Sequence, residues 1–325
     1  MESTESALLS TAPRVFAVSR CTHIVRYRLS LLSMQNLMAP IFQLIGRIGL
    51  VPFFGMALMF VATKANAQVE TDPDLSNGKL FIHGGGSITQ LQRSRFVAMA
   101  GGRSAKFVVV PTAQADDKIN EDEIKKRFAK NWHVNNVTVL HTRDPNVANS
   151  AEFVEALKSA NGVWLEGGRQ WRYADAYLDT EFHKELFAAL RRGAVIGGSS
   201  AGASIIASFL VRGSPGTTRN PEGDNRKVIA PGYTRGFGLL PESAIDQHVD
   251  ARNRTDDLNA VIKLNPKLLG VGIDQGAAVT VFRNTLTVTD GSIAIWNAAD
   301  RGLADSYVLR DGDMFDLLAR VRKAR

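Results

Sequence analysis

Residues 194–203 of the chain read Ala194-Val195-Ile196-Gly197-Gly198-Ser199-Ser200-Ala201-Gly202-Ala203. A short apolar run is followed by two glycines, two serines and then small residues, which predicts a strand, a tight turn and a helix. We expect that helix to continue to Leu210. The segment Gly198-Ser199-Ser200-Ala201-Gly202 fits G-x-S-x-G, the pattern of a nucleophile elbow. Ser200 is the middle residue and is therefore the candidate nucleophile.

The residue types of this motif suit a nucleophilic serine. A serine on a sharp turn is held in a strained backbone conformation, and flanking glycines let neighbouring backbone pass without a Cβ clash. The backbone N–H groups after Ser200, at a helix N-terminus, would face a developing oxyanion. A Gly/Ser-rich turn also suits a plain connection or a phosphate cradle, so the motif needs support from the rest of the chain.

The composition is that of a folded protein with an ordinary core. The chain has 325 residues, of which 45% are hydrophobic and 22% charged, which suits one large or two small domains. The formal net charge is +7, but much of the excess lies in the first 67 residues. No basic stripe or nucleic-acid module is present, so we expect no nucleic-acid partner.

Cysteine and histidine usage argues against metal and thiol chemistry. Cys21 is the only cysteine, and a mature chain without its leader would have none, which excludes disulfides, thiolate catalysis and cysteine-ligated zinc. The histidines lack the H-x-x-x-H and H-E-x-x-H spacings of helical metal sites. We therefore expect no metal site and no organic cofactor.

The N-terminal segment has the three parts of a secretory signal. Arg47 provides a positive flank, residues 49–62 form an apolar run, and Ala65-Asn66-Ala67 offers an A-x-A cleavage site. The run is shorter than the ~20 residues of a membrane span. We expect an extension and signal peptide over 1–67, with the signal at 34–67 and translation from Met1 or Met34. A single catalytic α/β domain over 68–325 would then be periplasmic or extracellular, without stable membrane insertion.

From Lys79 onward, short apolar runs alternate with amphipathic stretches. The runs predict strands at 80–82, 107–110, 137–140 and 163–165, and the stretches predict helices at 88–100, 121–132, 151–160 and 180–191. This alternation is typical of a doubly wound, mostly parallel sheet between two layers of helices, as in flavodoxin-like folds. The remainder predicts strands at 239–248, 269–274, 278–282 and 286–289, a helix at 256–264, and finally another strand and a short polar helix.

Three glycine-rich turns are expected to share one rim of this sheet. Ligands of such sheets bind beyond the carboxyl ends of the strands, and the turns at 84–86, at Gly167-Gly168 and at Ser200 all follow strands. The 84–86 turn lacks the lysine of a phosphate-binding loop and the dinucleotide-binding spacing, which disfavours nucleotide binding. The loop at 212–238 has about thirty residues, which is long for a plain connection and suggests a functional segment.

A serine nucleophile needs a base, and His248 is the best candidate. It ends a predicted strand in the same half of the chain as Ser200 and has polar neighbours. His83 lies at the same rim and is the second candidate. The other histidines after residue 67, which are His133, His141 and His183, suit solvated or local hydrogen-bonding roles.

These motifs together resemble peptidase family S51, the cyanophycinase-like serine peptidases, whose fold is similar to that of class I glutamine amidotransferases. The resemblance covers about residues 79–290 and is carried by the elbow, by Gly167-Gly168-Arg169-Gln170, and by Asp246-Gln247-His248 followed by Arg252. It implies that Ser200 is the nucleophile and His248 the base.

The resemblance also implies the supporting residues. Backbone N–H groups near Gly168 and Ala201 would form the oxyanion hole. The implied substrate-binding residues are Gln170, Asp246, Gln247 and Arg252. An arginine suits a carboxylate because its planar guanidinium matches it bidentately. The family pattern implies an acid in the loop between the serine and the histidine.

Three acidic residues are available to orient the base. Asp224 is our first choice because it lies closer to His248 in sequence, and Glu222 is the alternative. Asp246, two residues before the base, would share its face of a strand, but the resemblance assigns it to substrate.

The chain departs from the family pattern at three places. Arg169 stands where relatives commonly have Asp or Asn, Asp257 stands where cyanophycinase has a further arginine, and Asp274-Gln275-Gly276 replaces a more acidic stretch. These departures predict a less cationic pocket.

The predicted function is hydrolysis of a peptide or isopeptide bond at an aspartyl residue through an acyl-enzyme. The substrate would be an acidic peptide or a cyanophycin-like polymer, and a homodimer is compatible with the sequence. An α/β-hydrolase-like esterase and a non-catalytic binding protein of the same fold are the alternatives. A glutamine amidotransferase is disfavoured because that chemistry uses a cysteine at the elbow.

Overall fold

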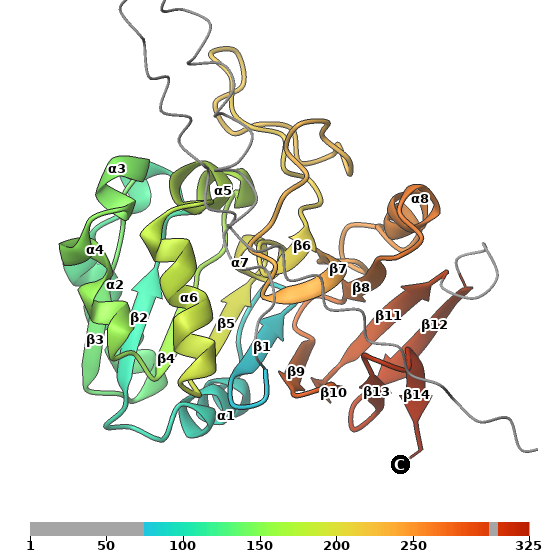
Figure 1. Ribbon diagram of the computed structural model, residues 1–325, viewed down its shortest axis with the longest axis horizontal. Coiled ribbons are helices and arrows are strands. Elements are labelled where there is room, and N and C mark those ends of the chain that lie inside the picture. Colours follow the sequence, from blue (N-terminus) through green and yellow to red (C-terminus); the bar gives the residue numbers. More distant parts are fainter. Residues whose placement is uncertain (1–74, 299–304, 325) are drawn as a thin grey trace, which may run out of the picture. The chain divides into compact units, whose positions relative to one another are not determined.

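Parallel strands form the centre of the protein (Figure 1). The computed structural model describes residues 75–298 and 305–324, which belong to one compact unit, Ala65–Arg325. The predicted extension and signal segment lie outside the described residues. The larger sheet of the described part is nine-stranded, in the order β14-β13-β10-β9-β1-β5-β4-β2-β3. Its parallel block consists of β1 (Lys79–His83), β5 (Val195–Ser199), β4 (Gly162–Leu165), β2 (Lys106–Val110) and β3 (Asn136–Val139).

The helices follow from caps and apolar faces that the sequence supplies. The side chains of Thr89, Asn120, Ser150 and Thr180 each accept a hydrogen bond from a backbone N–H of the first turn, which satisfies donors that a helix start leaves open. The helices are α1 (Gln90–Met99), α2 (Glu121–Trp132), α3 (Pro145–Ala148), α4 (Ala151–Lys158), α5 (Gln170–Tyr177), α6 (Glu181–Arg191), α7 (Ala201–Ser204) and α8 (Asp257–Leu264), with a 3-10 turn at Asp116–Lys118.

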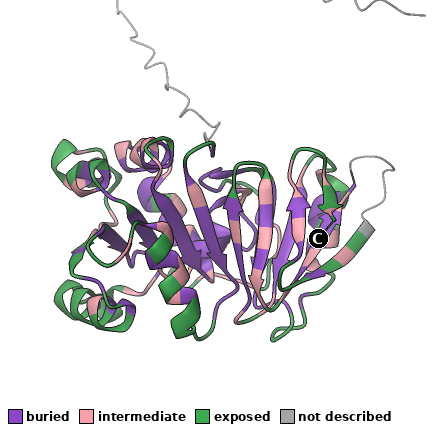
Figure 2. Cartoon of the chain, turned by 90° about the horizontal axis from the view of Figure 1, so that it is seen from below, coloured by how far each residue is buried: buried purple, intermediate pink, exposed green. Residues whose placement is uncertain are grey.

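Helices cover both faces of the parallel block, so its strands are buried on both sides (Figure 2). On one face, Phe96 of α1 packs edge-on against Trp164 of β4, with ring centroids 5.2 Å apart, and against Trp132 of α2 at 5.4 Å. On the other face, α4, α5, α6 and α7 pack over a second apolar core. The predicted doubly wound α/β fold is confirmed.

Antiparallel strands extend this block, and a second sheet combines parallel with antiparallel pairs. In the larger sheet, β9 (Ala278–Phe282) pairs antiparallel with β1 and continues into β10 (Thr285–Asp290), β13 (Met314–Asp316) and β14 (Val321–Lys323). The second sheet has the order β12-β11-β8-β7-β6. Its strands are β12 (Asp305–Arg310), β11 (Ser292–Asn297), β8 (Leu269–Ile273), β7 (Leu240–Gln247) and β6 (Ala207–Phe209).

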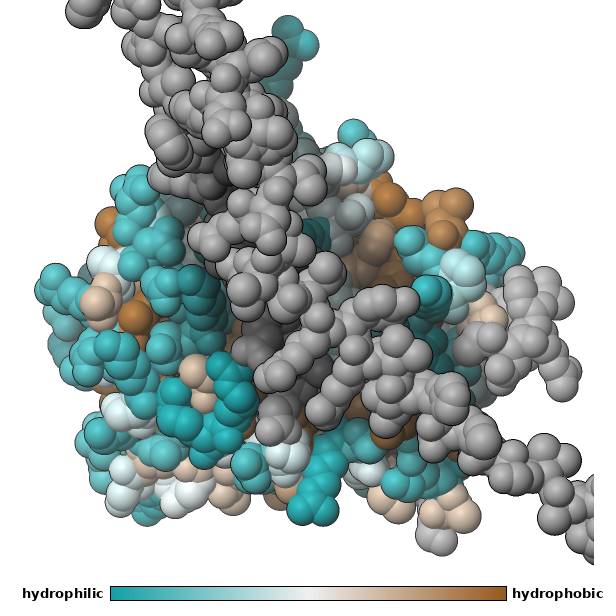
Figure 3. Space-filling view, viewed as in Figure 1, coloured by the Kyte–Doolittle hydropathy of each residue, from teal (hydrophilic) through white to brown (hydrophobic). Residues whose placement is uncertain are grey.

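The packing of α8 leaves an apolar residue at its end. The helix buries Leu258, Val261 and Ile262, whereas Leu264 is 71% exposed. The face drawn in Figure 3 is mostly hydrophilic, with a hydrophobic area in the region of α8. Among the described residues, no helix is long and apolar enough to cross a membrane.

Two sequence-based predictions are wrong in this region. The helix after the elbow ends at Ser204 rather than Leu210, because Ala207–Phe209 pairs with β7 and the backbone of Ile205 accepts from Phe237 N–H. A short closing helix was predicted, but residues 305–324 form strands instead. Phe315 of β13 is fully buried between partly exposed neighbours, which is the alternation of a strand.

The aromatic cluster predicts the cost of a core truncation. Replacing the fully buried Phe96 with Ala removes contacts to four other aromatic rings. We expect Phe96→Ala to lower the free energy of unfolding by about 3–5 kcal/mol, measured by urea denaturation. Leu91→Ala on the same helix is the control, because Leu91 is 58% exposed and should change stability by about 0.5 kcal/mol or less. Equal losses in the two variants would contradict the assignment of this core.

Candidate active site

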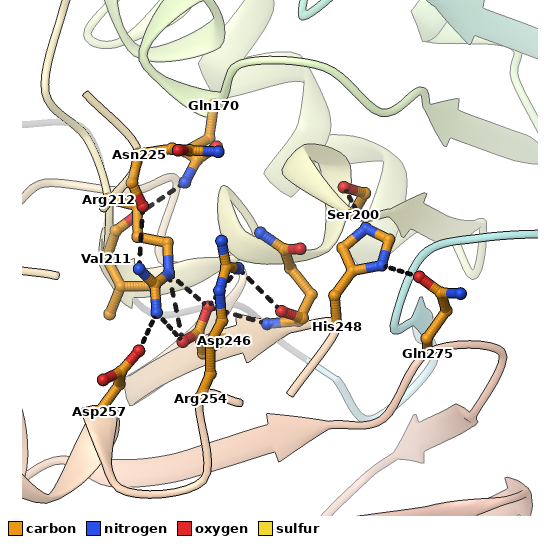
Figure 4. A network of polar contacts seen from close by, with 11 residues as sticks. Gln170, Ser200, Val211, Arg212, Asn225, Asp246, His248, Arg254, Asp257 and Gln275 are labelled. Carbon is orange, nitrogen blue, oxygen red and sulfur yellow. Dashed lines mark hydrogen bonds and ion pairs between the residues drawn. The ribbon is translucent and has the colours of Figure 1, made fainter. Parts of the chain in front are cut away.

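Ser200 and His248 meet at the carboxyl ends of two strands from different sheets (Figure 4). Ser200 follows β5 and has φ 55° and ψ −113°, the strained conformation of a nucleophile elbow. His248 follows β7. Its Nε2 lies 3.0 Å from Ser200 Oγ, within reach for proton transfer. The structure therefore brings the two predicted reacting residues together.

The elbow requires glycine on both sides because backbone passes very close to it. A Cβ atom at Gly198 would overlap the carbonyl of Gly202, and one at Gly202 would overlap the carbonyl of Leu165 on β4. The Ser200 N–H donates to His83 O at 3.1 Å, which ties the turn to β1. The spacing G-x-S-x-G is thus a packing requirement of this site.

An amide occupies the position where an orienting acid was predicted. His248 Nδ1 lies 2.7 Å from Gln275 Oε1, on the connection between β8 and β9. The Gln275 N–H donates to Asp250 Oδ1 at 2.7 Å. Sequence reasoning noted this stretch only as less acidic than in the family.

The two acids predicted to orient His248 lie elsewhere. Asp224 contacts Arg226 at 3.1 Å, and this hydrogen bond lowers the pKa of its carboxyl. Glu222 pairs with Arg169 at 3.1 Å and with Arg172 at 2.7 Å, which anchors the long loop to α5. Neither carboxylate contacts His248, because each is held by arginines. Both predictions for the orienting acid are therefore wrong.

The glycine turn at 84–86 supports the base. The His248 N–H donates to Gly84 O at 2.9 Å, and Gly85 has φ +94°. A Cβ atom at Gly85 would overlap the imidazole of His248. This turn therefore makes room for the ring, a role that its sequence did not reveal.

His83, the second candidate base, has a structural role. Its Nδ1 accepts from Gly85 N–H at 3.1 Å and lies 3.0 Å from Ser199 Oγ. Burial and the nearby His248 lower the pKa of His83 to about 4. The ring therefore stays neutral and links the glycine turn to the elbow strand.

The two backbone N–H groups that were predicted to form an oxyanion hole belong to Gly168 and Ala201. The Gly167-Gly168 turn packs against Ser200, and a Cβ atom at Gly167 would lie 3.2 Å from Ser200 Cβ. In the described part of the chain, the N–H groups of Gly168 and Ala201 donate to no backbone carbonyl. This arrangement is compatible with the predicted oxyanion hole.

The predicted substrate-binding residues fall into two groups. Gln170 and Asp246 support the site from inside. Gln170 donates to Val211 O at 3.0 Å, and Asp246 is 0% exposed, with its carboxylate bound by Arg212 and Arg254. Direct contact of Asp246 with substrate was therefore a wrong expectation.

Gln247 and Arg252 remain available to a ligand. The buried Oε1 of Gln247 has no hydrogen-bond partner among the described residues. Within the same residues, the exposed guanidinium of Arg252 contacts no carboxylate. Burial and the cations of Arg169 and Arg212 lower the pKa of Arg252.

Arg252 faces a polar cavity of about 340 Å³. The cavity is lined by Arg212, Asn225, Arg226, Arg252, Arg254 and Asp257. Asp257 forms an ion pair with Arg212 here. Within the described residues, no cluster of three or more potential metal ligands is found.

The fold and the serine–histidine pair define a doubly wound α/β protein with a nucleophile elbow. The chain belongs to peptidase family S51, whose model matches residues 80–289. A cyanophycinase of Geminocystis herdmanii is 27% identical over 207 residues, covering 61% of this chain and 74% of that enzyme. One of Nostoc sp. is 28% identical over 190 residues, covering 58% of this chain and 61% of that enzyme. A peptidase from an acI-B1 actinobacterium superposes with a TM-score of 0.56 at 18% identity, covering 74% of this chain and 96% of that one.

The packing at Gly85 gives a direct test of this geometry. We expect Gly85→Ala to displace the His248 ring and slow fluorophosphonate labelling of Ser200 by about 10²-fold, because general-base assistance is lost. Gly102→Ala is the matched control. Gly102 has a similar φ of +98°, and a Cβ atom there has nothing within 4 Å. Labelling rates that match between the two variants would show that Gly85 does not position the ring.

Proposed function

We propose that this protein is a serine-type peptidase of the cyanophycinase type, which cleaves a peptide or isopeptide bond at an aspartyl residue. The observation that carries the proposal is the 3.0 Å contact between Ser200 Oγ and His248 Nε2 at a strained elbow. Membership of family S51 and similarity to cyanophycinases support this reaction class. The predicted signal segment supports action in the periplasm or outside the cell.

The acylation step uses both reacting residues. Ser200 Oγ attacks the scissile carbonyl carbon while its proton passes to His248 Nε2. The N–H groups of Gly168 and Ala201 donate to the oxyanion. His248 then gives the proton to the leaving amine as the C–N bond breaks, which leaves an ester on Ser200.

Deacylation repeats the sequence with water. A water molecule attacks the ester carbonyl and gives its proton to His248 Nε2, and the imidazolium returns that proton to Ser200 Oγ as the ester bond breaks. The products are the free acid and the regenerated serine. Over the full cycle, the leaving amine gains the proton of Ser200, and Ser200 regains a proton from the attacking water.

The arginines of the pocket favour a substrate with one free carboxylate near the scissile bond. Arg212 and Arg254 are neutralised by Asp246 and, for Arg212, by Asp257. Among the cavity-lining residues, Arg252 is the cation that no carboxylate contacts. A β-linked aspartyl residue presents such a carboxylate. Cyanophycin, with release of β-aspartyl-arginine, is the substrate to test first.

Loss of the nucleophile is the first test. We expect the purified protein to release β-aspartyl-arginine from cyanophycin or to cleave β-aspartyl dipeptides, detected by mass spectrometry. Ser200→Ala should lower kcat/KM by roughly 10⁴-fold or more. Cleavage by Ser200→Ala at the wild-type rate would refute the nucleophile. If Ser200 labels with a fluorophosphonate and only simple esters are cut, the protein is an esterase. If Ser200 does not label and no substrate is cut, it is a binding protein.

Loss of the Arg252 guanidinium should affect substrate binding more than catalytic turnover. We expect Arg252→Gln to raise KM about 10- to 100-fold for substrates with a free carboxylate, because a charge-assisted hydrogen bond is lost. Arg226→Gln is the control from the same cavity, because its guanidinium pairs with Asp224. Equal KM values for both variants would exclude Arg252 as the carboxylate anchor.

A further inference from the structure

The Nδ1 atom of His248 faces a neutral amide instead of a charged acid. If Nε2 is to accept the proton of Ser200, the neutral ring must carry its own proton on Nδ1. Nδ1 then needs an acceptor, and Gln275 Oε1 lies 2.7 Å away (Figure 4). Among the described residues, no carboxylate forms a hydrogen bond or ion pair with His248.

We propose that Gln275 is the positioning residue of this site, whose amide oxygen holds His248 in the base-competent tautomer without contributing a charge. The inference rests on the proposed function and concerns how its base works. A flipped amide would present NH₂ to Nδ1 and place the ring proton on Nε2, where it blocks proton removal from Ser200. The orientation of the Gln275 amide thus decides which ring nitrogen of His248 carries the proton. An ionised carboxylate can only accept a hydrogen bond, so it would always place the proton on Nδ1.

The surroundings of Gln275 fix the backbone that carries its side chain. Its N–H donates to Asp250, and the next residue, Gly276, donates to Gly85 O at 2.8 Å. The carbonyl of Gly276 accepts from Gln92 Nε2 at 2.7 Å. The same turn that accommodates the His248 ring therefore also fixes the connection that carries Gln275.

A neutral partner gives the imidazolium of His248 a hydrogen bond but no counter-ion in direct contact. Burial lowers the pKa of His248 and the cations of Arg252 and Arg254 lower it further, while the Gln275 hydrogen bond raises it. The charged and titratable groups around the ring are Arg252 and Arg254 on the following turn, Asp246 on β7, His83 on β1 and Asp250 beside Gln275. Asp246 is held by arginines, and His83 stays neutral.

This arrangement fixes the sign of the pH dependence. The base works as neutral imidazole, so its activity is lost as pH falls through the pKa of His248. Because that pKa is below the ordinary value of 6.5, activity should persist to a lower pH than an unperturbed histidine would allow. A carboxylate at position 275 would raise the pKa and move the acid limb of the profile to higher pH.

The test compares Gln275→Glu and Gln275→Leu with the wild-type protein. The readouts are the rate of fluorophosphonate labelling of Ser200 from pH 4.5 to 9 and the imidazole titration of His248 by NMR. We expect Gln275→Glu to raise the pKa of His248 and to speed labelling at pH 8 by about tenfold or more. Gln275→Leu should slow labelling by about 10²-fold with the fold retained in circular dichroism.

Asn253→Asp is the matched control, because it adds the same charge at an exposed turn near His248 in sequence. Asn253→Asp should change the labelling rate of Ser200 and the pKa of His248 less than Gln275→Glu does. The inference is overturned if Gln275→Leu labels as fast as wild type, or if Gln275→Glu leaves the His248 titration unchanged. Failure of both wild type and Gln275→Glu to label Ser200 would refute the proposed function, while the titration would still decide the role of Gln275.

Discussion

The hydrogen bond from Ser200 N–H to His83 O holds together the two halves of the site. Ser200 has a positive φ, a conformation that costs on the order of 1–3 kcal/mol and persists only when the surroundings enforce it. Here β1 enforces it, because the His83 ring also contacts Ser199 and accepts from Gly85. The end of β1 at His83 thus positions both the elbow at Ser200 and the 84–86 turn, which packs against the His248 ring.

The second organising feature is the buried carboxylate of Asp246. An unpaired charge at 0% exposure would be strongly unfavourable, and Arg212 and Arg254 supply two partners. Asp257 forms a second ion pair with Arg212. These ion pairs occupy the guanidinium groups of Arg212 and Arg254. Within the described part of the chain, Arg252 is the cavity-lining arginine that no carboxylate contacts. The proposed preference for a substrate carboxylate therefore depends on these ion pairs, because they leave Arg252 without a carboxylate partner in the described residues.

Local patterns in the sequence predicted the elbow and the parallel block, because both depend on short-range constraints. The G-x-S-x-G spacing is visible within one short stretch, although Gly202 is required by its contact with Leu165 of β4, and strand periodicity is visible over a few residues. The orienting group was predicted wrongly because it depends on strand pairing. Gln247 is in register with Ile273 across β7 and β8, which places Gln275 beside His248. Asp224 is nearer in sequence but lies in a loop whose path no local pattern determines.

Two of the departures that the resemblance implies, at Asp257 and Gln275, would act on different steps of the proposed chemistry. A carboxylate at 257 lowers the positive charge available to bind an anionic substrate, and an amide at 275 lowers the stabilisation of the imidazolium. Both residues form side-chain contacts in the structure, because Asp257 pairs with Arg212 and Gln275 accepts a hydrogen bond from His248 Nδ1. The contacts that the proposed acyl transfer needs are therefore present, while an amide at 275 would stabilise the imidazolium less than a carboxylate would. Under the proposed function, orientation by Arg252 and the backbone donors would supply the larger share of transition-state stabilisation.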